Sequence, residues 1–189
     1  MKLFWERGYE GTSFDDLIGA MGISPSSFYN SFGSKERLYR EATDAYLEES
    51  GKWFLGILGD ATDTKTAFTR LFQATATQFT RGDLPPGCMI SLAGAHISPT
   101  LNAIRDMMAG HRALSQATMA ERLSKGIAMG DLPPDTNVDV LAAFYSALAR
   151  GMAVQARDGA TRERLAEIAD VAMRAWPEPE RKRRGSKSA

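Results

Sequence analysis

The spacing of apolar residues along the chain predicts helices almost throughout. The first clear helical face has the i, i+3, i+4, i+7 spacing of Phe14, Leu17, Ile18 and Met21. Four later segments repeat such a face, and no segment alternates apolar and polar residues with a period of two. The sequence therefore predicts an all-α fold, with helices over about 1–7, 14–20, 25–31, 35–58, 64–81, 88–95, 99–129, 137–157 and 161–176.

Glycine and proline residues divide this pattern. The sequence Gly-Asp-Leu-Pro-Pro occurs twice, at 82–86 and 130–134, but its flanks differ, so we interpret each copy as a helix stop rather than as an internal repeat. Three short, closely joined helices come first and long helices follow. We therefore predict a small module at 1–47 and a helical body at 48–177. The polar, basic segment 178–189 has no large apolar residue, and we expect a disordered tail.

Composition narrows the class of protein. The 189-residue chain is 43% hydrophobic and 24% charged, which is typical of a globular protein. This composition excludes a chain that is disordered over its whole length. Its single cysteine excludes a disulfide framework and any zinc site that needs several thiolates. No apolar run approaches the roughly 18 to 20 residues of a membrane span, and the first residues lack the apolar run and cleavage site typical of a signal peptide. We therefore expect a cytoplasmic protein without a membrane partner.

The segment 13–32 carries the most informative pattern. Ser13 and Ser24 are good N-caps, Gly22 suits a tight turn, and Pro25 fits the first position of a second helix. That helix would pack back through Phe28. Its other face carries short or flat uncharged groups that suit a DNA major groove, namely Ser26, Ser27, Tyr29 and Asn30. The residues alone fit either a helix-turn-helix or an ordinary pair of helices with a polar outer face.

A wider segment resolves these alternatives by resemblance. Glu6-Arg7-Gly8-Tyr9-Glu10-Gly11-Thr12-Ser13, the two helices, and Phe28-Tyr29-Asn30-Ser31-Phe32-Gly33-Ser34-Lys35-Glu36 together resemble the DNA-binding domain of TetR/AcrR transcriptional regulators. The similarity covers residues 4 to about 47 and is looser in the body, at 86–90 and 151–156. It implies a TetR-like fold, with a three-helix helix-turn-helix domain joined to a ligand-binding and dimerisation bundle.

The resemblance also implies roles for particular residues. Helix 25–31 would be the recognition helix on a roughly palindromic double-stranded DNA operator. The implied DNA-binding positions are Thr12, Ser13, Ser24, Pro25, Ser26, Ser27, Tyr29, Asn30 and Lys35. Family members usually have about ten more residues in the first helix, often with basic residues ahead of it. Residues 1–46 hold five basic and seven acidic residues, which is weak for phosphate binding.

The partners implied are a second copy of the chain and a small molecule. The family dimerises through two C-terminal helices, here 137–157 and 161–176, although intramolecular packing alone would also occupy their apolar faces. We expect a repressor released by a small-molecule effector; a regulator without a ligand is the alternative. We expect the effector pocket between helices 35–58, 64–81, 99–129 and 137–157. The expected lining is Phe54, Phe68, Phe72, Met89, Met107, Met108, His111 as a polar anchor, Phe144 and Tyr145.

An enzyme, or a small-molecule-binding helical protein without DNA-binding activity, is the alternative function. Cys88, His96 and His111 lie 8 and 15 residues apart, which matches no metal-ligand spacing that we can defend. The sequence also contains no phosphate loop, nucleophile elbow or dinucleotide fingerprint. We therefore predict no catalytic residue, no metal and no cofactor.

Overall fold

The structure is a computed structural model that describes residues 1–60, 63–93, 98 and 101–178. All the secondary structure of these described residues is helical, which confirms the predicted all-α fold. The helices are α1 (Lys2–Arg7), α2 (Phe14–Met21), α3 (Pro25–Phe32), α4 (Lys35–Gly59), α5 (Thr64–Phe79), α6 (Met89–Leu92), α7 (Asn102–Met129), α8 (Val138–Arg157) and α9 (Arg162–Met173).

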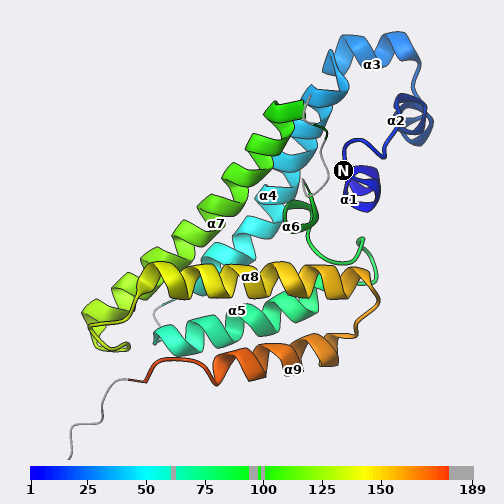
Figure 1. Ribbon diagram of the computed structural model, residues 1–189. Helices are drawn as coiled ribbons and strands as arrows, with labels where there is room; N and C mark the ends of the chain where they lie inside the picture. Colours follow the sequence, from blue (N-terminus) through cyan, green and yellow to red (C-terminus); the bar gives the residue numbers. More distant parts are fainter. Residues whose placement is uncertain (61–62, 94–97, 99–100, 179–189) are drawn as a thin grey trace, which may run out of the picture.

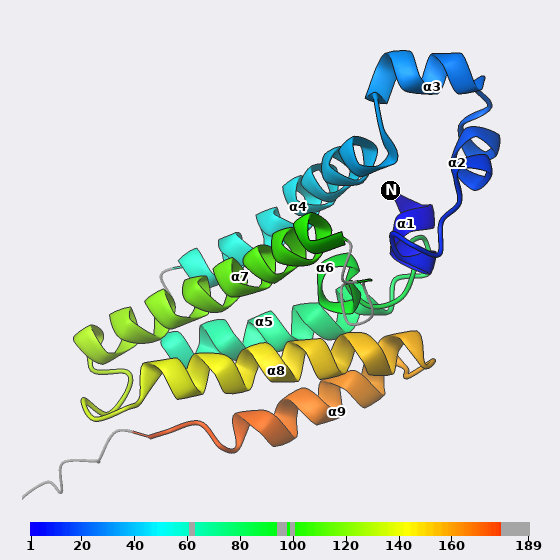
Figure 2. The ribbon, with the colours of Figure 1, turned by 45° about the horizontal axis from the view of Figure 1, so that its top comes forward.

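The helices form a small end and a larger body. α2 and α3 lie at one end of the molecule, and α4 runs from that end into the body beside α7 (Figures 1 and 2). There α5, α8 and α9 lie side by side, with α5 packed against both α8 and α9. None of the helices in the described part of the chain is long and apolar enough to cross a membrane.

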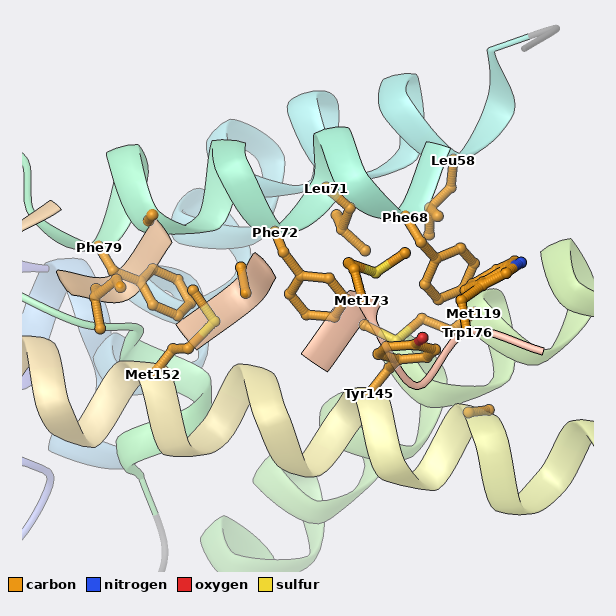
Figure 3. Packing of buried hydrophobic residues seen from close by; sticks show 14 of the residues in the cluster. Leu58, Phe68, Leu71, Phe72, Phe79, Met119, Tyr145, Met152, Met173 and Trp176 are labelled. Carbon is orange, nitrogen blue, oxygen red and sulfur yellow. The ribbon is translucent and has the colours of Figure 1, made fainter. Parts of the chain in front are cut away.

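Aromatic side chains fill the centre of the body (Figure 3). The ring of Phe68 lies 5.1 Å from that of Tyr145 and 5.3 Å from that of Trp176, measured between ring centroids. Phe72 lies 5.3 Å from Tyr145 on the same measure. These contacts join α5, α8 and the segment after α9 into one core, and burial of such large rings contributes much of the stability of a domain.

Trp176 explains why the last helix is shorter than predicted. α9 ends at Met173, three residues before the predicted end at 176. The chain then leaves the helix, and Trp176 is 5% exposed against Phe68 and Tyr145. Burial of the indole outside the helix overrides the helical spacing that placed Trp176 on the last turn.

The helix before the first Gly-Asp-Leu-Pro-Pro sequence stops as predicted, two residues earlier than expected. α5 ends at Phe79 with Thr80 as its C-cap, and Gly82 follows the end without capping it. Gly87 is the residue with the special geometry, at φ 86°, and a Cβ there would lie 2.6 Å from the carbonyl oxygen of Ala153 in α8. At the second copy Gly130 is the left-handed C-cap of α7, as predicted.

A second core lies under the N-terminal module. It contains Phe4 and Trp5 from α1 and Phe28 from α3, together with Met89 of α6 and Met108 of α7. The core of the module therefore extends across the boundary predicted at residue 47 into the body. Of the other predicted elements, residues 94–95 and 99–100 and nearly all of the basic tail at 178–189 lie outside the described residues.

Candidate nucleic-acid interface and ligand cavity

Local hydrogen bonds define the two helices of the predicted helix-turn-helix. Ser13 caps α2 by a reciprocal arrangement in which its Oγ accepts from the Asp16 N–H at 3.0 Å and its own N–H donates to Asp16 Oδ2 at 2.9 Å. The hydrogen bonds from Ser13, followed by the Arg7 guanidinium, hold the pKa of Asp16 below its usual range. Gly22 turns the chain at φ 64°, and Ser24 caps α3 by accepting from the Ser27 N–H at 3.2 Å.

Adjacent aromatic residues of α3 have opposite environments. Phe28 is fully buried, with its ring centroid 4.9 Å from that of Phe14 in α2. Tyr29 is 56% exposed, and one face of its ring stacks on Phe14 at a centroid distance of 5.3 Å. The neighbouring helix thus supports the ring of Tyr29, while most of the residue remains available to a partner.

The remaining polar positions of this region form one uncharged surface. The side-chain oxygen of Ser24 lies 3.0 Å from that of Ser26 and 2.9 Å from that of Ser27. The predicted DNA-binding positions that are exposed are Ser13, Ser24, Pro25, Ser26, Ser27, Tyr29 and Asn30. All of these residues except Ser13 lie on or next to α3, whereas Ser13 lies at the start of α2.

Lys35 lies at the edge of this surface. It is the first residue of α4, and its Nζ lies 4.5 Å from the centroid of the Tyr9 ring. Partial burial lowers the pKa of the Lys35 ammonium, with a smaller opposing effect of Glu10. The cation is therefore held by an aromatic face just after the end of α3.

Thr12 does not belong to the exposed surface. Its side chain is fully buried, and its hydroxyl donates to the Gly8 carbonyl at 2.7 Å and to the Leu3 carbonyl at 3.3 Å. The prediction that the Thr12 side chain is available to DNA is wrong, because its hydroxyl closes the C-terminal end of α1 instead. The resemblance located the position correctly in sequence but could not show which way its side chain points.

Most basic side chains of the N-terminal module are already neutralised. Arg7 pairs with Asp16 at 2.9 Å, and two further ion pairs lie within α4: Arg37 with Glu41 at 3.1 Å and Arg40 with Glu36 at 2.8 Å. All three pairs are substantially exposed to solvent and contribute little to stability. The surface around α3 therefore offers polar hydrogen-bonding groups rather than a concentration of unpaired positive charge.

A cavity of about 120 Å³ lies in the body, between α4, α5, α6, α7 and α8. Two of the predicted pocket residues, Phe54 and Phe72, line it. The full lining is Tyr46, Leu47, Ser50, Gly51, Trp53, Phe54, Leu71, Phe72, Thr75, Phe79, Cys88, Ile90, Ser91, Arg112, Ser115, Met119, Ser146, Ala149 and Arg150. The four helices expected around a pocket therefore do enclose a space, with α6 as a fifth wall.

The other predicted pocket residues lie elsewhere. Phe68 and Tyr145 are fully buried in the aromatic core, whereas Met89, Met107 and Met108 belong to the core under the N-terminal module. Phe144 is 44% exposed and lines a surface groove beside Pro133 and Pro177, and His111 is not part of the cavity wall. These assignments are corrected because an apolar helical stripe looks the same whether it faces solid core or a cavity.

The polar groups of the cavity were missed by the sequence reading. The hydroxyl of Tyr46 donates to Cys88 Sγ at 3.1 Å, and burial raises the pKa of Tyr46 well above its usual value. Arg112 Nη1 donates to the carbonyls of Ile90 and Ala93, at 3.2 and 2.8 Å. The sequence did contain a signal for Arg112 as a cavity residue. Arg112 lies four residues after Met108 and therefore on the buried face of the same helix.

The described residues contain no group of three or more His, Cys, Asp or Glu side chains placed to hold a metal ion. His96 lies outside the described residues.

Comparison with known proteins places the whole chain in one class of DNA-binding proteins. The family model for bacterial regulatory proteins of the tetR family matches residues 1–42, and that for the tetracyclin repressor-like C-terminal domain matches residues 66–171. The chain belongs to the TetR family and is a DNA-binding transcriptional regulator.

Particular relatives share nearly the full length. The HTH-type transcriptional repressor ComR of Escherichia coli K12 is 34% identical over 179 residues, which cover 94% of this chain and 85% of ComR. A cysteine mutant of the TetR family regulator CifR, solved with a 26-bp double-strand operator DNA, matches with a TM-score of 0.90 and 41% identity, over 93% of this chain and 92% of that one. The repressor DhaR of Mycobacterium sp. GP1 is 24% identical over 92% of this chain and 86% of its own.

Proposed function

We propose that this regulator is a homodimeric repressor that binds a roughly palindromic operator in the cytoplasm and leaves it when a small molecule occupies the cavity of the body. One observation carries the proposal: a single continuous helix joins the two sites. α4 begins at Lys35, directly after α3, and its Tyr46 and Phe54 line the cavity. A ligand that shifts α4 in the body therefore moves the recognition helix at its other end.

In the operator complex α3 lies in the major groove. Ser26, Ser27 and Asn30 have hydrogen-bonding ends that reach base edges or phosphates, and Tyr29 lays its exposed ring on the sugar–phosphate backbone or a thymine methyl. Lys35 contacts a phosphate. The similar CifR structure was solved on operator DNA, which supports this arrangement.

Dimerisation uses α8 and α9. Both helices lie on the outside of the body (Figure 2) and carry exposed apolar side chains: Val140, Phe144 and Val154 on α8 and Val171 on α9. Burial of these side chains against a second copy removes them from water. A two-fold dimer presents two copies of α3, which matches a palindromic site.

Release by the ligand is a population shift. The ligand prefers the state in which the two α3 helices are wrongly spaced for the operator, and the differential affinity for the two states sets how far the equilibrium moves.

Selection of binding sites from random double-stranded DNA tests the proposal. We expect enrichment of an inverted repeat by the wild-type protein. Asn30→Asp, which adds a negative charge on the exposed face of α3, should abolish the enrichment without unfolding the protein. Gln73→Glu adds the same charge on an exposed position of α5, far from α3 (Figure 1), and should leave the enriched sequence unchanged.

Two results would contradict the proposal. One is the recovery of no preferred sequence by a folded wild-type protein. The other is an equal loss of enrichment by Asn30→Asp and Gln73→Glu, which would show that the effect does not come from α3.

A further inference from the structure

We propose that the effector is a small amphiphilic anion, a carboxylate on an apolar body, whose charge is held by Arg112 and Arg150. This inference rests on the proposed ligand-released repressor and specifies the ligand of its cavity. Both arginines line the cavity, one from α7 and one from α8.

The charge of the cavity wall has one sign. Arg112 and Arg150 are the charged residues of the lining, and no Asp or Glu is among them. Among the described residues, neither guanidinium forms an ion pair with an acidic side chain. Burial and then the nearby charge of Arg150 lower the pKa of Arg112. Two partly buried cations without a counter-ion are stabilised by any anion that enters.

The two arginines have different hydrogen-bonding states. Arg112 uses Nη1 to hold the carbonyls of Ile90 and Ala93, at the end of α6. Within the described chain no hydrogen bond engages the guanidinium of Arg150. Arg150 can therefore offer its planar fork to a carboxylate, and Arg112 can add a further donor.

The rest of the wall suits an apolar body of limited size. Phe54, Leu71, Phe72, Phe79 and Met119 supply its apolar surface. A protein cavity of about 150 Å³ lined by such side chains holds benzene. The cavity of about 120 Å³ is somewhat smaller, which limits the apolar body to about one ring or a short alkyl chain.

The position of Arg112 also suggests how the anion reaches the DNA-binding module. α6 is four residues long, and its Met89 and Ile90 pack in the core that contains Phe4 and Trp5 of α1. A carboxylate that binds the remaining N–H groups of Arg112 draws the guanidinium toward the cavity and away from the carbonyl oxygens of Ile90 and Ala93. Loss of those hydrogen bonds frees the end of α6 and shifts the surface on which α1 rests.

Calorimetric titration with paired probes tests the inference. Benzoate, phenylacetate, hexanoate and octanoate are each compared with the corresponding primary amide, which keeps the shape and removes the charge. We expect at least one acid to bind at least about 10-fold more tightly than its amide, because hydrogen bonds between charged partners are the stronger ones. The same acid should release selected operator DNA, whereas its amide should not.

Substitutions locate the site. Arg150→Gln should weaken binding of that acid about 10- to 100-fold and leave the amide unaffected, and Arg112→Gln should do the same. Arg150→Lys should restore part of the affinity, which a merely structural role of the side chain would not explain. Arg70→Gln is the matched control, because Arg70 is an exposed arginine of α5 paired with Asp60, outside the cavity.

Failure of this inference can be separated from failure of the proposed function. Amides that bind and release DNA as well as the acids, or an acid affinity unchanged in Arg150→Gln, would overturn the anion site and leave the repressor intact. Absence of binding by every acid would also overturn it. Loss of DNA selection by the wild-type protein would contradict the repressor, while calorimetry would still report on the anion site.

Discussion

The helix-turn-helix end and the cavity of the body differ in how far apart their residues lie in the sequence. The surface around α3 draws its polar groups from one short segment, and Ser24, Ser26 and Ser27 even contact one another. The cavity draws its wall from five helices, from Tyr46 in α4 to Arg150 in α8. A local surface can be recognised from a motif, whereas a cavity exists only after distant helices have packed.

The two regions also differ in how they are held. The core of the body joins α5, α8 and the segment after α9 through the rings of Phe68, Tyr145 and Trp176. Among the described residues of α3, Phe28 alone has a buried side chain, so this ring supplies the main contact that holds the helix. Burial and exposure are therefore divided between the neighbouring residues Phe28 and Tyr29, and four substitutions can test how the small end is held and used.

The largest effect is expected for Phe28→Ala. Removal of this fully buried ring should lower the free energy of unfolding by about 3 to 5 kcal/mol, from lost burial and from the cavity left behind. Denaturant unfolding measures the change. DNA binding should fall as a consequence. A protein of unchanged stability would show that α3 is held by other contacts.

Tyr29→Ala should weaken operator binding more than it lowers stability. Loss of the exposed ring should weaken binding to the selected operator by about 1 to 3 kcal/mol, the scale of one specific contact. The lost stacking on Phe14 should cost about 1 kcal/mol of stability at most. Titration of operator and scrambled duplex, with a melting curve, separates the two effects. If Tyr29→Ala destabilised the protein as much as Phe28→Ala, our assignment of the two faces would be wrong.

Arg157 tests whether the body supports the N-terminal module. Its guanidinium, at the end of α8, donates to the carbonyls of Trp5 and Glu6 at the end of α1. Arg157→Gln should lower the free energy of unfolding by about 0.5 to 1.5 kcal/mol, the net value of typical hydrogen bonds at an accessible site. Arg164→Gln, at an exposed ion pair in α9, is the control. Equal effects of both variants in equilibrium unfolding would argue against a specific link.

The smallest effect concerns the cap of α2 and its dependence on pH. Hydrogen bonds from Ser13 lower the pKa of Asp16 in the folded protein below the reference of 3.8, so its carboxylate stabilises the fold above that pH. The contribution is lost as pH falls through the lowered folded-state pKa. Asp16→Asn should therefore melt below wild type at pH 7, and the difference should shrink below about pH 4. Ser13→Ala, which removes the hydroxyl that donates to the Asp16 carboxylate at 2.6 Å, should reduce the pH dependence of the melting temperature.

Much of the recognition end was predictable from sequence. The caps Ser13 and Ser24, the turn at Gly22 and the exposed face of α3 all lie where the motif indicated. Thr12 was the exception, since the chain folds back and its hydroxyl meets the carbonyl of Gly8. The sequence predicted which helices surround the cavity, but it did not predict most of the residues that line it.

The sequence by itself determined the helices, because caps, turns and hydrogen bonds within a helix involve residues a few positions apart. The resemblance of the wider segment then identified two of these helices as a helix-turn-helix. The tertiary structure alone decided which apolar faces became solid core and which became a cavity wall. It buried Phe68 and Phe72 in one core, but only Phe72 also lines the cavity, although both lie on one face of α5. It also brought Arg112 and Arg150 to one cavity from two helices, since the distance between residues far apart in sequence depends on how whole helices pack.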